Sequence, residues 1–265
     1  MSNNRSSLLW SLEKEGRVSY LFGTMHVKDY RVHSFVELIR PYLDECQSFA
    51  TEFHLKEMGQ MGATDFQYFP DGQTLKDFWQ LTKYKKVARM INKSFQLDIS
   101  PFDRLLPLFL VNMISESVLY NSENLALDSV LWQYAERNHK DLFGLESIED
   151  QFRILSSIPL PYQLKSISGI AKNPKSFRTS LTRMIKLYER QDIDMLYKLS
   201  KRTLGKQRNL MLYDRNKKMI VRLIKELENR QSTFCAVGAA HLSGKYGMLS
   251  LMKKNGYVVK PIFFN

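Results

Sequence analysis

Two segments more than two hundred residues apart read as apolar strands that end in the same motif. Residues 19–27 read SYLFGTMHV, and residues 233–244 read TFCAVGAAHLSG. Each apolar run predicts a strand, and each strand stops at Gly-x-x-His. A glycine ahead of the histidine lets the backbone turn sharply or approach another group closely. Because neither end of the chain makes a sheet alone, we expect the two termini to meet in one sheet.

The segments around these motifs supply further strands. The chain ends in a strand, a helix and a strand, an order that favours parallel pairing of its two strands. Residues 8–24 predict a hairpin, because alternating apolar residues flank a glycine turn in EKEGR. The remaining expected strands are 47–55, 141–147, 232–241 and 257–264.

The middle of the chain is expected to be mainly helical, at about 60–140 and 150–230. Within it, Pro101 is predicted to open a long helix in PFDRLLPLFLVNMISESVL. We therefore expect one α/β domain over 1–265. Its mixed sheet is built from N- and C-terminal segments and carries a large helical insertion.

Two imidazoles and two carboxylates fall at the ends of predicted strands. In open α/β sheets, functional groups collect at the carboxyl ends of parallel strands. Imidazole nitrogen and carboxylate oxygen suit a divalent metal, and a metal-bound water has its pKa lowered to about 7. The residues concerned are His26, His241, Glu52 and Glu146.

Each of these residues also has a simpler explanation. Gly-x-x-His occurs by chance, and a strand-end histidine often hydrogen-bonds the backbone. For either histidine alone, we favour a backbone hydrogen bond as the explanation. Because both histidines follow strands in the same way, a functional site explains them equally well. A buried carboxylate such as Glu52 or Glu146 needs a partner, which a structural ion pair or a helix cap also provides.

Composition narrows the function classes. The net charge is +12, but the lysines and arginines are scattered over helical segments without a dense basic run, so no nucleic-acid motif is indicated. Cys46 and Cys235 form no C-x-x-C pair. No apolar run is long enough to span a bilayer, and the N-terminus does not read as a signal peptide. We expect a cytoplasmic protein.

The two ends of the chain resemble the TraB/GumN (PrgY-type) family. LLWSLEKEGRVSYLFGTMHV is similar to that family's opening hairpin, and AVGAAHLSGKYGMLSLMKKNGYVVKPI is similar to its ending. The middle adds GLE in GLESIEDQF and an Arg-Asn pair in LYDRNKKMI, in the family's order. The resemblance implies a fold related to erythromycin esterases and ChaN-like haem-binding proteins. The matching site residues are His26, Glu52, Glu146, Arg215, Asn216 and His241.

The resemblance also implies an activity, since the family is similar to the TIKI proteins, which are described as divalent-metal-dependent proteases. We predict a peptidase in which His26, His241 and Glu52 hold Mn, Co or Zn. Glu146 then takes a proton from the bound water, although the reverse assignment of the two glutamates stays open. Arg215 would stabilise the oxyanion or hold a substrate carboxylate, and Asn216 would orient Arg215 or the substrate.

Two alternatives remain open. One is a metal-free ester or lactone hydrolase with a histidine general base. The other is a non-catalytic protein that binds a peptide or haem, since paired histidines also ligate haem iron. The expected partner is a peptide or a small molecule, and the sequence predicts no oligomeric state.

Overall fold

The computed structural model describes residues 6–56, 67–119 and 125–264, so parts of the predicted helical insertion lie outside the described residues. The chain divides into two compact units. Unit 1 is made of 1–55, 122–148 and 184–265, and unit 2 is made of 56–121 and 149–183. That the whole chain is one domain stays a prediction.

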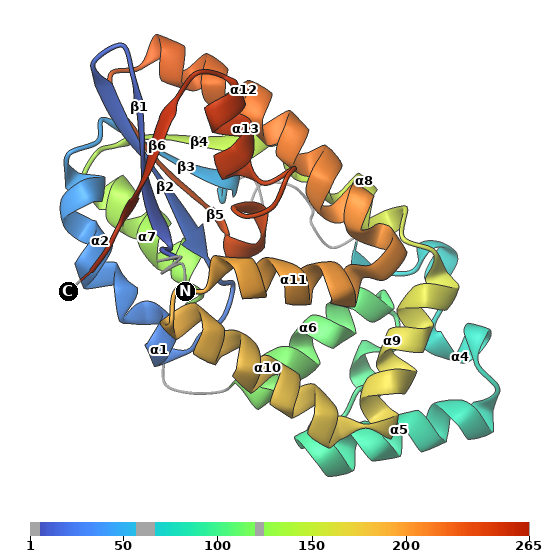
Figure 1. The fold of residues 1–265 in the computed structure, drawn as a ribbon. Helices are drawn as coiled ribbons and strands as arrows, with labels where there is room; N and C mark the ends of the chain where they lie inside the picture. The colour runs from blue at the N-terminus through green and yellow to red at the C-terminus, as the bar shows by residue number, and fades with distance from the viewer. Residues whose placement is uncertain (1–5, 57–66, 120–124, 265) are drawn as a thin grey trace. The chain divides into compact units, whose positions relative to one another are not determined.

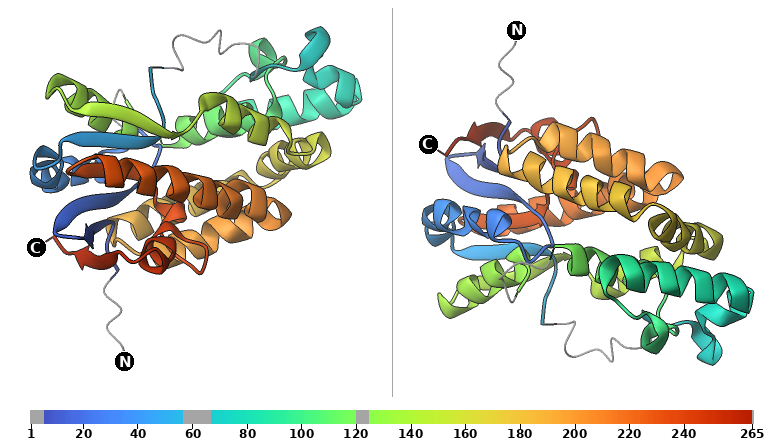
Figure 2. Two further views of the ribbon diagram at one scale, coloured as in Figure 1. Left: turned by 90° about the horizontal axis from the view of Figure 1, so that it is seen from above. Right: turned by 90° about the horizontal axis from the view of Figure 1, so that it is seen from below.

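Unit 1 contains a six-stranded mixed sheet in the order β4-β3-β5-β2-β1-β6. β2 and β5 pair in parallel, as do β5 with β3 and β3 with β4, whereas β1 is antiparallel to both of its neighbours. β1 and β6, from opposite ends of the chain, lie side by side (Figure 2). The strands are β1 (Leu9–Lys14), β2 (Arg17–Thr24), β3 (Ser48–Phe53), β4 (Asp141–Glu146), β5 (Thr233–Gly238) and β6 (Val258–Ile262).

The strand order fixes where the helices of unit 1 lie. The connections from β2 to β3 and from β3 to β4 step in one direction along the sheet, and those from β4 to β5 and from β5 to β6 step in the other. Right-handed crossovers therefore put α2 (Phe35–Asp44) and α7 (Leu127–Arg137) on one face, and α12 (Arg215–Asn229) and α13 (Met248–Lys254) on the opposite face (Figure 1).

The core of unit 1 joins strands from both termini. The ring of Phe234 on β5 packs against Phe22 of β2 and Phe49 of β3, with ring centroids 6.1 Å apart in each pair. All three side chains are fully buried. Burial of such large apolar side chains is the dominant favourable contribution to folding, so the sheet needs both ends of the chain.

The other helices of unit 1 are α1 (Tyr30–His33) and α11 (Ile193–Leu204). Short turns at Gly205–Gln207 and Ala239–His241 and a π-helical segment, Asn209–Asp214, complete the unit.

Unit 2 is helical. Its apolar core includes Trp79, Ile91, Leu110 and Ile167, which belong to different helices or follow them. The helices are α4 (Leu75–Phe78), α5 (Leu81–Phe95), α6 (Pro107–Val118), α8 (Ile148–Ser156), α9 (Leu160–Lys172) and α10 (Pro174–Glu189), of which α8 begins and α10 ends in unit 1. In the described part of the chain, no helix is long and apolar enough to cross a membrane.

The α/β class and the mixed sheet from both termini are confirmed. Two details were wrong. The helix predicted from Pro101 begins at Pro107 instead, after a 3-10 turn at Ser100–Phe102. The two C-terminal strands run in the same direction but do not pair, because the β2–β1 hairpin lies between them in the sheet.

Candidate functional site

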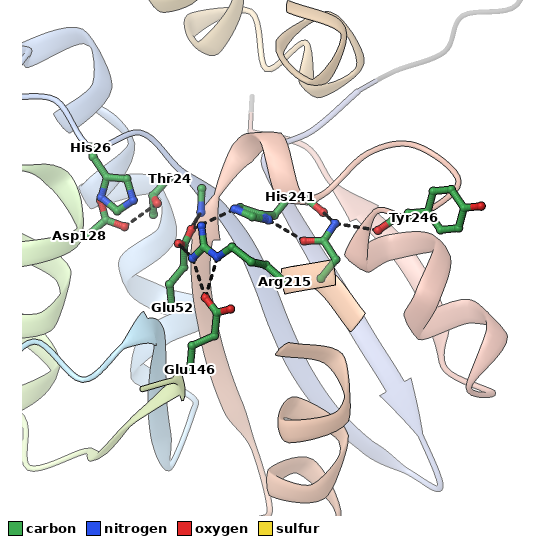
Figure 3. A network of polar contacts seen from close by, with 10 residues as sticks. Thr24, His26, Glu52, Asp128, Glu146, Arg215, His241 and Tyr246 are labelled. Atoms are coloured by element: carbon green, nitrogen blue, oxygen red, sulfur yellow. Dashed lines mark hydrogen bonds and ion pairs between the residues drawn. The ribbon is translucent and has the colours of Figure 1, made fainter. Parts of the chain in front are cut away.

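Four predicted site residues reach one edge of the sheet of unit 1. The strands that carry them are parallel neighbours, and Thr24 at the end of β2 pairs with Gly238 at the end of β5. The carboxyl ends of β3 and β4 lie at the same edge. The residues found there are His26, His241, Glu52 and Glu146 (Figure 3).

Arg215, the first residue of α12, joins the two glutamates. Its Nη2 donates to Glu52 Oε2 and to Glu146 Oε2, both at 2.6 Å, and its Nε donates to Glu146 Oε2 at 2.8 Å (Figure 3). All three side chains are buried. A buried carboxylate is stable only with such a partner, so the guanidinium allows two acidic groups to share one dry site.

These contacts determine the charge on Glu52. Burial by itself raises the pKa of Glu52, but the positive charge of Arg215 and the hydrogen bond from the Gly238 N–H to Oε1, at 2.8 Å, hold the pKa well below its usual range. Burial likewise opposes the charge of Arg215, and the two carboxylates keep the pKa of Arg215 above its ordinary value. Glu52 and Arg215 are therefore both ionised at neutral pH.

Asn216 fixes the tautomer of His241. The Asn216 side-chain NH₂ donates to the carbonyls of His241, at 3.3 Å, and Tyr246, at 2.7 Å, so its oxygen is the acceptor for His241 Nδ1 at 2.6 Å. The proton of the neutral imidazole is therefore on Nδ1. Burial, reinforced by the charge of Arg215, lowers the pKa of His241 to about 4, so the ring is neutral at neutral pH.

Two acceptors consequently face each other. The unprotonated Nε2 of His241 lies 3.7 Å from Glu52 Oε1, beyond hydrogen-bond distance. A lone pair on neutral nitrogen and a carboxylate oxygen repel unless a proton donor or a cation is shared between them. This pair is the feature of the site that most directly suggests a bound cation.

His26 is held by a residue that sequence reasoning missed. Its Nδ1 lies 2.8 Å from Oδ2 of the buried Asp128, whose Oδ1 accepts a 2.5 Å hydrogen bond from the Thr24 hydroxyl (Figure 3). The charge of Asp128 outweighs partial desolvation and raises the pKa of His26 to about 9. The side chain of His26 is 54% exposed, so a ligand can reach it.

The glycines of the two motifs serve close packing. Neither has a positive φ, but a Cβ on Gly23 would lie 2.8 Å from Leu242 Cδ1 and 3.0 Å from Ala239 Cα. A Cβ on Gly238 would lie 3.2 Å from Glu52 Oε1. The absent side chains let the turn that carries His241 settle against β2 and let Glu52 reach the backbone of β5.

The structure links five of the six predicted site residues through hydrogen bonds and the 3.7 Å contact. His26 lies at the same edge but in its own pair with Asp128. Asn216 contacts His241 and Tyr246, where we had expected it to orient Arg215 or the substrate. The five linked residues are Glu52, Glu146, Arg215, Asn216 and His241.

Asp128 did carry a signal in the sequence. It lies three and four residues before the buried Leu131 and Trp132, so it shares the apolar face of α7. An acidic residue at such a position requires a buried partner.

The donors have the chemistry that a divalent metal requires. A metal-ligating histidine usually donates its other ring N–H to a carboxylate or carbonyl oxygen, and both His26 and His241 have Nδ1 held in this way. Glu52 Oε1 adds a hard oxygen. Across residues 6–56, 67–119 and 125–264, however, no three histidine, cysteine or acidic side chains are close enough together to hold one ion. The donor types fit a divalent metal, and the structure brings two of the three predicted ligands, Glu52 and His241, close together.

Comparison with known proteins identifies relatives of the whole chain. A sequence profile described as the TraB/PrgY/gumN family matches residues 8–261. The chain is 23% identical to the metalloprotease TIKI homolog of Nematostella vectensis, over 98% of this chain and 68% of that protein. It is 22% identical to metalloprotease TIKI2 of Xenopus tropicalis, over 96% of this chain and 60% of that protein. The chain thus spans about 60 to 68% of the length of these relatives. The search of solved structures found no significant match.

Proposed function

The chain belongs to the TraB/PrgY/gumN family, and from this premise we propose that it is a divalent-metal-dependent hydrolase that cleaves peptides. The observation that carries the proposal is the pair of facing acceptors, His241 Nε2 and Glu52 Oε1, 3.7 Å apart. The names of the TIKI relatives support the reaction class. The proposal includes the erythromycin esterase/ChaN-like fold that the resemblance implies, with which the mixed sheet agrees.

In this proposal Glu52, His241 and His26 hold the ion, which is Mn, Co or Zn. The metal supplies one chemical effect, a lowered pKa of a bound water. Asn216 acts on His241 as a positioning residue, because it keeps Nε2 unprotonated and turned toward Glu52. Asp128 orients His26 through Nδ1, and because it raises the pKa of His26 to about 9, an ion bound there would have to displace the proton of Nε2.

The remaining two residues handle protons and charge. Glu146 is assigned to take the proton of the attacking water and pass it to the leaving amine. Arg215 places Glu146 next to Glu52 through its Nε and Nη2. We assign its Nη1 to the substrate, where a positive charge stabilises the developing oxyanion.

The His26–Asp128 pair favours a second candidate, a metal-free ester or lactone hydrolase. A carboxylate beside Nδ1 of a half-exposed imidazole orients the ring so that Nε2 acts as a general base once the ring is neutral, and because the pKa of His26 is about 9, this candidate works at alkaline pH. Such an enzyme would use His26 as base and would need no ion between Glu52 and His241.

Peptide cleavage tests the proposal. A mixed peptide library is incubated with the chain, with added Mn, Co or Zn or with a chelator. We expect cleavage with metal and none with chelator, and we expect His26→Asn and His241→Asn each to lose at least about a hundredfold in turnover. His139→Asn is the matched control, because His139 is exposed and its positive φ suits asparagine.

Equal cleavage with metal and with chelator would contradict the metal role. Ester hydrolysis that persists in chelator, falls in His26→Asn and survives in His241→Asn would favour the metal-free candidate.

A further inference from the structure

Unit 2 contains a groove that the proposed hydrolase site does not use. It lies between α5 and α9, which pack against each other, and Phe78 and Trp79 at the end of α4 line one part of it. Its volume is about 770 Å³, within the usual range of roughly 300–1,000 Å³ for small-molecule pockets. Apolar side chains, among them Val87 and Leu164, line its interior.

The charged residues that line the groove, within the part of unit 2 that the structure describes, are lysines. Lys83 and Lys86 come from α5, and Lys165 and Lys172 come from α9, so positive charge lies on both helices. Among the described residues of unit 2, no acidic side chain lines the groove. All four lysines are exposed, and Lys83 Nζ lies 5.2 Å from the centre of the Trp79 ring. Four like charges around an apolar pocket complement an anion that has an apolar body.

Trp79 adds an independent observation. Its side chain is buried, at 5% exposure, and its indole Nε1 has no hydrogen-bond partner among the described residues. A buried N–H without an acceptor is costly, and an indole can only donate. Trp79 lines the groove beside Lys83, and because its Nε1 is itself covered, an anionic acceptor in the groove reaches this donor only after the indole ring turns toward it.

We propose that this groove binds a small anionic amphiphile, a molecule with one apolar chain and a carboxylate or phosphate head. The chain fills the apolar interior, and the head lies among the lysines and accepts from Trp79 Nε1. The volume of the groove, about 770 Å³, is that of a small-molecule pocket. The proposal does not depend on the hydrolase function.

Calorimetric titration of the full chain tests it. The probes are dodecanoate, dodecyl phosphate and dodecyltrimethylammonium, each below its micelle concentration. We expect the two anions to bind to one site and the cation to bind at least tenfold more weakly. Lys83→Glu with Lys86→Glu should weaken anion binding at least tenfold, and Trp79→Phe, which keeps a ring and removes the N–H, should weaken it about tenfold.

The matched control is Lys85→Glu with Arg89→Glu, which makes the same change in charge on exposed residues of α5 that do not line the groove. This variant should bind the anions as the unmodified chain does. No anion binding, equal binding of the cation, or equal weakening by both double variants would overturn the proposal. So would an acidic amphipathic peptide that occupies the groove more tightly than either anion.

Discussion

At the scale of single residues, Arg215 donates hydrogen bonds to both glutamates of the site. Without the guanidinium of Arg215, the two buried carboxylates would repel each other. The same arginine lowers the pKa of both Glu52 and His241. One cation thus keeps Glu52 ionised and adds to the effect of burial that keeps His241 neutral.

Replacement of Arg215 by methionine should lower the free energy of unfolding by about 3–5 kcal/mol, because two buried carboxylates lose their partner. Urea unfolding measures the change. Arg222→Met is the control, since Arg222 belongs to a part-exposed ion pair with Glu226 and should cost less than about 1 kcal/mol. Equal losses in the two variants would contradict the shared role of Arg215.

The two histidines give stability a dependence on pH with opposite signs. The pKa of His241 is about 4 in the folded chain and ordinarily near 6.5, so only the unfolded chain gains a proton as pH falls through this window, and stability falls. The pKa of His26 is about 9, so its contribution is complete below 6.5 and is lost as pH rises toward 9. Their combined contribution is largest near pH 6.5.

Urea midpoints between pH 4.5 and 8.5, measured with chelator present, test these signs. His241→Asn should flatten the acid side of the profile, and His26→Asn should flatten the alkaline side. Variants that shift the profile without changing its slope on the expected side would contradict the assignment.

At the scale of elements, the two Gly-x-x-His motifs are explained by a single pairing. β2 and β5 are parallel neighbours that end together, and the glycine of each motif makes room for the contact that follows. Both β2 and β5 could be predicted from the sequence because each contains a continuous apolar run.

Gly23→Ala tests the packing role of the first glycine. The added methyl group would press on the backbone of Ala239, so we expect a loss of about 1–3 kcal/mol in the free energy of unfolding. Gly169→Ala, in α9 with no atom within 4 Å of the new Cβ, should be neutral or stabilising. Equal stability of the two variants would show that Gly23 is not needed for close packing.

Other elements were beyond sequence reasoning for physical reasons. The helix predicted from Pro101 begins six residues later, because proline suits a 3-10 turn as well as a first helical turn. The π-helical segment Asn209–Asp214, directly before Arg215 and Asn216, breaks the 3.6-residue period that predicts which side chains face inward. The partner of a buried charge, such as His26 for Asp128, depends on contacts across a hundred residues of sequence.

At the scale of the molecule, unit 1 is built from three separate segments around one core. Cys46 and Cys235 belong to that core and come from opposite halves of the chain. Burial raises the pKa of the Cys46 thiol to about 12, against a weaker opposing effect of Lys140, and burial also raises that of Cys235. Both thiols are therefore protonated and covered in the folded state.

Thiol labelling tests whether unit 1 unfolds as one. Neither cysteine should react with iodoacetamide at pH 8 in the native chain, and both should react at one common rate as urea is raised. Mass spectrometry of the labelled peptides gives the two rates. Faster labelling of Cys235 than of Cys46 would mean that the C-terminal strands open separately from the rest of the sheet.

The central claim is that Glu52 and His241 share a divalent cation. Its most direct test is a calorimetric measurement of Mn²⁺ binding to the chain after bound metal has been removed. The account predicts one ion per chain, with binding lost in Glu52→Gln and His241→Asn, weakened about 10- to 100-fold in Asn216→Ala, and kept in His139→Asn. Failure of the unmodified chain to bind Mn²⁺, Co²⁺ or Zn²⁺, or unchanged affinity in both Glu52→Gln and His241→Asn, would contradict it.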